Sequence, residues 1–128
     1  MVEVNGHIGH GAILHSCIVR RDALVGMNAV VMDEAEVGEK AIVAACAFVP
    51  AGMKVPARSL AAGIPAKVRR ELSDEEIAWK LEGTQTYQAL TVRSLASLHE
   101  VAPLAEVEKD RPRLPATDVK SLIATRRG

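Results

Sequence analysis

Aromatic side chains are almost absent from this chain of 128 residues, which has one Trp, one Tyr and one Phe. It therefore lacks an aromatic platform for stacking bases and has few large residues for an ordinary globular core. The 16 Lys and Arg residues balance 16 Asp and Glu residues, so no net field attracts nucleic acid or an anionic membrane. We expect an aliphatic core, and neither nucleic acid nor membrane as a partner.

Cysteine is also scarce, the sequence has no long apolar run, and we expect no secretory leader. Two cysteines, Cys17 and Cys46, fit a reducing cytoplasm better than a disulfide scaffold. We expect both thiols to be structural, because no orienting base accompanies either of them. The length allows one compact domain with an appended element.

A period of six residues dominates the first half of the chain. Every sixth residue is aliphatic at Ile13, Val19, Val25, Val31, Val37, Val43, Val49 and Val55. The residue four places after each of these is small at Cys17, Ala23, Ala29, Ala35, Ala41 and Ala47. Helices repeat near 3.6 residues and strands at two, so neither element explains this spacing.

Three short strands per coil of a triangular prism do explain it, and hexapeptide periodicity is typical of such a β-helix. Each coil takes about 18 residues, so Val19, Val37 and Val55 should stack in one column. A β-sandwich is the alternative, but it would show a period of two. The pattern predicts an all-β solenoid over residues 1–66, followed by α-helix.

The corners of the prism need turn residues. Gly26 and Gly38 directly follow inward positions and suit a positive φ, while Asn28 and Asp33 suit turns. Upstream, Ile8-Gly9 resembles another strand and corner but lies five residues before Ile13. We therefore expect one shortened corner between Ile8 and Ile13.

The repeat ends near Pro65, which lacks the backbone donor that a further strand needs. Ser73 and Glu76 form a capping box, which predicts a helix beginning at about Asp74. Gly83 is expected to end or bend this helix, and a second helix is expected over residues 84–99. The predicted organisation is a β-helix over residues 1–66, a helical extension over 67–101 that packs on it, and a flexible tail over 102–128.

Three histidines, His7, His10 and His15, lie near the start of the repeat, and imidazole is a common zinc ligand. In extended chain His10 and His15 are up to roughly 16 Å apart, whereas zinc bonds its ligands at about 2 Å. One chain is therefore not expected to clamp a metal with this pair. In a cyclic trimer, however, His10 of one subunit can face His15 of its neighbour. Ordinary surface or interface histidines are the alternative.

Two runs carry a resemblance to a known group: GHIGHGAILH from Gly6 to His15 and LVGMNAVVMD from Leu24 to Asp33. They closely resemble γ-class carbonic anhydrase-like hexapeptide proteins. The segment Ile64-Pro65-Ala66-Lys67 of this chain also resembles the turn that closes the β-helix in that group. Within that group, four further segments look like the phenylacetate-degradation "Y" protein and the carnitine-operon "E" protein. These are Trp79-Lys80, Thr86-Tyr87-Gln88, Leu98-His99 and Arg111-Pro112-Arg113-Leu114.

The resemblance implies a left-handed parallel β-helix, a homotrimer, and zinc or a similar divalent metal between subunits. His10 and His15 match two of the three ligand histidines of the group. His7 is a weaker candidate, because the matching ligand lies farther upstream in the relatives. Family members also carry earlier coils, so this sequence is expected to correspond to a C-terminal portion, with His7 or water filling the missing ligand position.

Three functions remain open on this basis. A complete metal site would hydrate or hydrolyse a small-molecule substrate, and the phenylacetate-type resemblance narrows this to acyl-CoA thioesters. The second is CoA-dependent acyl transfer, in which Lys67, Arg69 and Arg70 would meet the CoA phosphates; a solvated basic face is the alternative for these three. The third is a non-catalytic trimeric accessory protein of the phenylacetate or carnitine pathway.

Overall fold

The computed structural model describes residues 1–111. Nine strands of two residues each lead to a hairpin and then a helix. The short strands are β1 (His7–Ile8), β2 (Ile13–Leu14), β3 (Ile18–Val19), β4 (Leu24–Val25), β5 (Val30–Val31), β6 (Glu36–Val37), β7 (Ile42–Val43), β8 (Phe48–Val49) and β9 (Lys54–Val55). The hairpin and the helix are β10 (Ser59–Gly63), β11 (Ala66–Glu71) and α1 (Asp74–Ser97).

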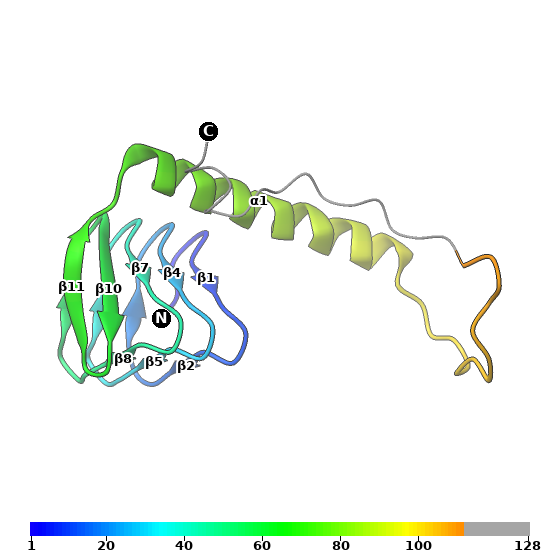
Figure 1. Cartoon of the computed structure of the whole chain (residues 1–128), viewed down its shortest axis with the longest axis horizontal. Helices are drawn as coiled ribbons and strands as arrows, with labels where there is room; N and C mark the ends of the chain where they lie inside the picture. The colour runs from blue at the N-terminus through cyan, green and yellow to red at the C-terminus, as the bar shows by residue number, and fades with distance from the viewer. Residues whose placement is uncertain (112–128) are drawn as a thin grey trace. The chain divides into compact units, whose positions relative to one another are not determined.

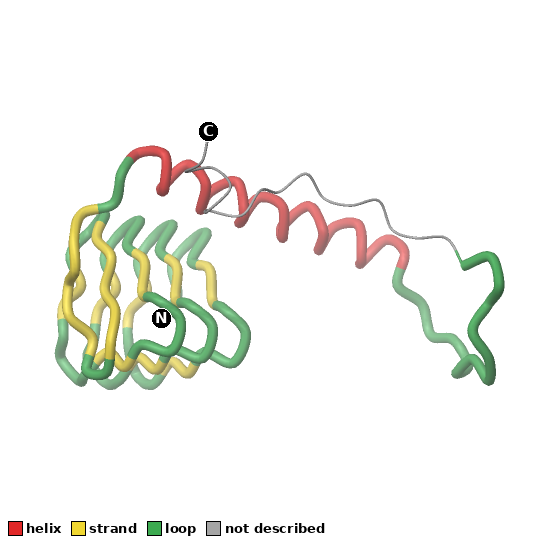
Figure 2. Tube along the Cα trace, in the orientation of Figure 1, coloured by secondary structure: helices red, strands yellow, loops and turns green. Residues whose placement is uncertain are grey.

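The short strands form the three faces of a prism. Each strand from β1 to β7 pairs in parallel with the third strand after it, which lies one coil later. The faces are β1-β4-β7-β10, β2-β5-β8 and β3-β6-β9 (Figures 1 and 2). Val19 pairs with Val37, and Val37 with Val55, so the predicted column exists. The hexapeptide-repeat, left-handed β-helix predicted from the period of six is confirmed.

The core is the aliphatic ladder together with the small residues beside it. The inward valines of the ladder have a relative exposure of 0%: Val19, Val25, Val31, Val37, Val43 and Val49. Each buried valine contributes on the order of 1.5–3 kcal/mol, so a stacked column stabilises the prism without aromatic residues. Cys17 lies in this core, whereas Cys46 is exposed at a corner.

The predicted inward position of Ile13 is wrong. Ile13 is 57% exposed, while its neighbour Leu14 packs against the core. Leu14 and Val19 are the consecutive inward positions, and they are five residues apart rather than six. The shortened corner therefore lies between Leu14 and Val19, and not before Ile13. Counting by six from Val19 reached Ile13 only because both residues of β2 are aliphatic.

The roles expected for two corner glycines are also wrong. A positive φ occurs just before the small inward residues, for example at Asn28 with φ 55°, and not at Gly26 or Gly38. Instead, these glycines leave room for the next coil. A Cβ at Gly26 would lie 2.5 Å from the nitrogen of Ala45, which is too close for any side chain.

The end of the solenoid is a hairpin in which β11 runs antiparallel to β10. The turn connects Gly63 to Ala66, so the parallel stacking stops near Pro65 as predicted. The edge of β10 is paired with β11 and is thereby protected from pairing with another chain. The extension predicted for residues 67–101 thus begins with a strand.

Helix α1 begins at Asp74, as the capping box predicted. The nitrogen of Ser73 donates to Glu76 Oε2 over 3.1 Å, and the nitrogen of Glu76 donates to Ser73 Oγ over 3.3 Å. The expected end of the helix at Gly83 and the separate second helix over residues 84–99 are wrong, because α1 is one continuous helix to Ser97. Glycine inside a helix costs only about 1 kcal/mol, which the surrounding helical turns can absorb.

The chain divides into two units, Met1–Thr84 and Gln85–Gly128. In the first unit, the α1 residues Glu76, Ile77, Lys80 and Thr84 are buried. In the second unit, Tyr87, Leu90, Leu95 and Leu98 are exposed. Residues 98–111 contain no helix or strand, and the rest of the predicted tail, 112–128, lies outside the described residues. None of the helices found in the described part is long and apolar enough to cross a membrane.

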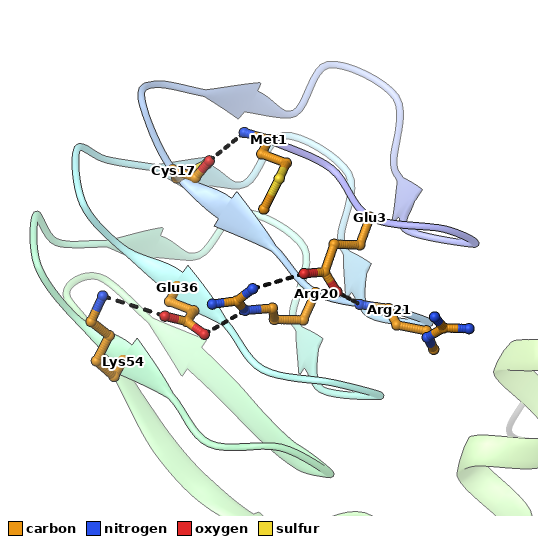
Figure 3. Close-up of polar contacts among 7 residues, drawn as sticks. All are labelled: Met1, Glu3, Cys17, Arg20, Arg21, Glu36 and Lys54. Carbon is orange, nitrogen blue, oxygen red and sulfur yellow. Dashed lines mark hydrogen bonds and ion pairs between the residues drawn. The ribbon is translucent and has the colours of Figure 1, made fainter.

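Charged side chains form a ladder across the coils on the face of β3 and β6 (Figure 3). Arg20 donates to Glu3 over 2.7 Å from Nη1 and to Glu36 over 2.6 Å from Nε. Lys54 Nζ lies 3.5 Å from the other oxygen of Glu36. The bonds to Arg20 lower the pKa of both Glu3 and Glu36. This face is polar, unlike the face of β2.

Candidate functional site at the β2 face

His10 and His15 lie at the two corners that flank strand β2. His10 is in the corner between β1 and β2, and its carbonyl accepts a hydrogen bond from the nitrogen of Asn28 over 2.9 Å. His15 is in the corner between β2 and β3, and 64% of its side chain is exposed. The two imidazoles therefore border the same face of the prism, from opposite corners.

That face is apolar on its outer side. In each two-residue strand the first residue points outward, which here exposes Ile13, Val30 and Phe48 to different degrees. Ile13 is 57% and Met27 55% exposed. An exposed apolar strip between two histidine corners is typical of a surface that another protein chain covers.

His15 is held by a residue of the next coil. Its Nδ1 lies 2.9 Å from Oδ1 of Asp33, which is at the same corner one coil later. Asp33 was expected only as a turn residue, so the sequence analysis missed this contact. The repeat gave no signal for it, because residues of this strand pair with residues 17 later and His15 aligns with Met32 rather than with Asp33.

His7 lies on a different face, in strand β1. Its Nδ1 is 3.2 Å from the hydroxyl of Thr84 in α1. Burial is the main cause that lowers the pKa of His7, and the nearby charges of Lys80 and His10 lower it further. His7 is thus engaged between the first coil and the helix by its contact with Thr84.

Lys80 and Asp22 are two buried polar residues of the first unit. Lys80 is only 4% exposed, and its Nζ donates to the carbonyl of Asn5 over 3.1 Å. Burial lowers the pKa of Lys80, whereas the charge of Asp22 opposes this. Asp22 Oδ1 is buried and has no hydrogen-bond partner within the described residues. Sequence reasoning did not find this cluster, because its members are far apart in the chain.

The three basic residues predicted to contact CoA, Lys67, Arg69 and Arg70, differ in their hydrogen-bond partners within the chain. Arg70 makes two bonds to the carboxylate of Glu76, of 2.7 and 2.8 Å, and this contact raises its pKa. Arg69 Nε donates to the carbonyl of Ala62 over 3.2 Å, and its side chain is exposed, as is Lys67. Of these three residues, Arg70 is paired with a carboxylate, and Lys67 and Arg69 are not paired with Glu76.

Imidazole groups are the potential metal donors at the β2 face. Among residues 1–111, no group of three or more His, Cys, Asp or Glu side chains is placed to hold a metal ion within one chain. His10 and His15 border an exposed face, and imidazole nitrogen suits zinc.

The stacked coils, the small inward residues and the corner geometry define a hexapeptide-repeat protein. No family model matches the chain. Its sequence is 55% identical over 121 residues to the carnitine operon protein CaiE of Salmonella agona, which confirms the predicted resemblance to the carnitine-operon group. The match covers 94% of this chain and 61% of the relative, so the chain spans about three fifths of that relative's length.

Two solved structures share this fold. A Bacillus cereus protein named as a candidate acetyltransferase matches with a TM-score of 0.67 and 40% identity, over 71% of this chain and 54% of that one. A hexapeptide transferase family protein from Anaplasma phagocytophilum matches with a TM-score of 0.67 and 37% identity, over 73% of this chain and 55% of that one. The fold and a carnitine-operon relative are therefore shown, and the chemistry is a matter of proposal.

Proposed function

We propose that this chain forms a homotrimer that binds a divalent metal, zinc in the first instance, between subunits and hydrates or hydrolyses a small-molecule substrate. The observation that carries the proposal is that His10 and His15 flank one exposed apolar face, with His15 held by Asp33. A cyclic arrangement repeats this contact three times and joins one subunit's His10 corner to its neighbour's His15 corner.

Burial of the β2 face supplies the driving force for the trimer. Ile13 and Met27 together would remove substantial apolar area from water, at about 25 cal/mol per Å². The charged ladder on the β3 face does not offer this, because its ions are already paired within the chain. The trimer therefore forms through β2, and both imidazoles become part of its interface.

The residues of the chain have separate tasks at such a site. His10 and His15 each present a ring nitrogen, and Asp33 restrains the ring of His15. His7 is held by Thr84 on another face, so water rather than His7 fills the third ligand position. When bound, the metal supplies a water that is acidic enough to act as a nucleophile near neutral pH. The substrate class proposed is an acyl-CoA thioester of the carnitine or phenylacetate type.

Metal content and quaternary structure test this proposal together. We expect purified, dialysed protein to sediment as a trimer and to retain about one zinc ion per subunit, as expected for one site at each interface. His10→Ala and His15→Ala should each remove the metal, while His99→Ala, an exposed histidine of the second unit, should not. A monomer, or metal retained in both variants, would refute the proposal.

Acyl transfer is the second candidate, and the similarity to hexapeptide transferases favours it. In this case His15, oriented by Asp33, would act as a general base, while Lys67 and Arg69 would contact CoA phosphates. The two reactions differ in their products. A hydrolase releases free CoA from a thioester with water alone, whereas a transferase requires an amine or hydroxyl acceptor. CoA release measured with and without acceptors, before and after chelation, separates them.

A further inference from the structure

The contact between His15 and Asp33 determines which ring nitrogen of His15 carries a proton. An ionised carboxylate can only accept hydrogen bonds, so Nδ1 of His15, at 2.9 Å from Asp33 Oδ1, must be the donor. In the neutral imidazole, Nε2 then has the free lone pair. A lone pair is what either a metal ligand or a general base requires, so this contact selects the competent tautomer.

The shortened corner is what allows the contact. The nitrogen of His15 donates to the carbonyl of Val31, as the nitrogen of Met32 donates to Val49 a coil later, so His15 and Met32 occupy equivalent corner positions. In the later coil Asp33 separates Met32 from Glu34, which has φ 57°. In the earlier coil Ser16, with φ 45°, follows His15 directly.

One corner residue is therefore missing beside His15. Its absence removes the side chain that would otherwise stand above Asp33 in the stack. The carboxylate of Asp33 remains 44% exposed and turned to the ring of His15. The corner after β5 has four residues, 32–35, whereas the corner after β2 has three, 15–17. A full corner after β2 would place its own second residue, rather than the histidine, next to Asp33.

We infer that Asp33 is a positioning residue for His15, and that the one-residue deletion in the corner after β2 is the feature that joins them. The inference rests on the proposed function for its metal, but the tautomer itself belongs to the metal-free protein. Carboxylates that orient metal-binding histidines typically change metal affinity by about 10–100-fold when removed.

The first test needs no metal. Nitrogen NMR of the His15 ring, at a pH of about 8 where a free imidazole is neutral, should show a proton on Nδ1 in the natural protein. Asp33→Ala should shift the ring towards the tautomer protonated on Nε2. Asp33→Asn should restore part of the original tautomer, because the amide oxygen still accepts a hydrogen bond.

The second test is zinc titration of the same proteins against a competing chelator. We expect Asp33→Ala to bind zinc about 10–100-fold more weakly, with Asp33→Asn between it and the natural protein. Glu34→Gln is the control, because it removes a charge from the same corner and leaves the contact intact. Thermal unfolding of each variant checks that the corner still folds.

The outcomes separate the two proposals. If the natural protein binds no zinc, the proposed metal function fails, while the NMR result still decides the role of Asp33. If His15 carries its proton on Nε2 in the natural protein, or if Asp33→Ala leaves the tautomer unchanged, the inference is overturned. If Glu34→Gln loses as much zinc affinity as Asp33→Ala, the loss comes from removing a negative charge and not from the contact with His15. That result also overturns the inference.

Discussion

Ile13 and Leu14 are adjacent in strand β2 and face opposite sides of it. Ile13 is 57% exposed on the outer face, and Leu14 packs against the core inside the prism. The inward position of Leu14 shows that the repeat is one residue short between Leu14 and Val19. It thereby fixes the register of the first coil. It also separates the residue that holds the coil together from the residue available for association.

Leu14→Ala and Ile13→Glu should therefore have different effects. Leu14→Ala leaves a cavity and should lower the free energy of unfolding by about 2 kcal/mol, measured by urea denaturation. Ile13→Glu should instead convert trimer to monomer in sedimentation experiments, because it places a charge in the apolar interface. Ala57→Glu, at an exposed corner elsewhere, is the matched control. If Ile13→Glu remains trimeric, the β2 face is not the interface.

Gly26→Ala should be among the most damaging small substitutions in the solenoid. Its Cβ would meet backbone atoms of the next coil at 2.5 to 2.8 Å, so two coils must separate, at a cost of about 3 kcal/mol or more. Gly52→Ala is the comparison, because it also alters a corner but meets nothing within 4 Å. At φ 72°, it should cost only about 1 kcal/mol. Similar melting temperatures for the two variants would contradict this account.

The buried Lys80 should make stability depend on alkaline pH. Burial lowers the pKa of Lys80 in the folded state below the ordinary 10.5, so the unfolded chain binds the proton more tightly. The charged side chain therefore opposes folding at neutral pH, and this opposition fades as the pH rises through the lowered pKa towards 10.5.

Lys80→Met removes this effect, and the comparison with the natural protein isolates it. The unfolding free energy of the natural protein should rise relative to that of Lys80→Met as the pH approaches 10.5. Urea denaturation across this range gives the difference. Lys67→Met, which removes an exposed lysine, should show no such trend. A difference that stays constant with pH would mean that Lys80 is not desolvated in the folded state.

The Arg20 ladder should affect stability at acid pH. Arg20 lowers the pKa of Glu3 and Glu36 below the ordinary 4.5, so the bonds stabilise the fold above that pH. This contribution is lost as the pH falls through the lowered values. Arg20→Met should thus be less stable than the natural protein at pH 7, and the gap should narrow on acidification.

Acid unfolding followed by circular dichroism checks this expectation. Arg93→Met, on the exposed surface of α1, is the control and should track the natural protein throughout. Because the ladder is solvent-exposed, added salt should also narrow the gap at pH 7. A gap that is independent of both pH and salt would indicate lost packing of the Arg20 side chain rather than lost charge.

Much of the solenoid was predictable because its information is local and repeated. Each valine reports the same environment, so counting by six found the core, the column through Val19 and Val37, and the end near Pro65. The capping box placed the start of α1 correctly, since Ser73 and Glu76 contact each other within one turn. Gly83 was misjudged because a single glycine lowers helix stability without ending the helix.

The site was only partly predictable. His10 and His15 were identified by residue type and by resemblance, and the structure adds that both border the β2 face. The tie between His15 and Asp33 was missed, because a turn residue acquires a second role only when coils stack. Arg70 was placed among the candidates for CoA binding by its charge, and only the fold brings Glu76 against it.

The amino-acid sequence by itself determined the repeat, the aliphatic core and the helix start, because these depend on neighbouring residues or on a regular spacing. Tertiary structure decided which residue of β2 points inward, why Gly26 is glycine, and which carboxylate meets His15. Each of these depends on the distance between two coils, and a deletion of one residue shifts every contact across that gap. The local sequence pattern does not show which contacts such a deletion changes, because those contacts exist only between stacked coils.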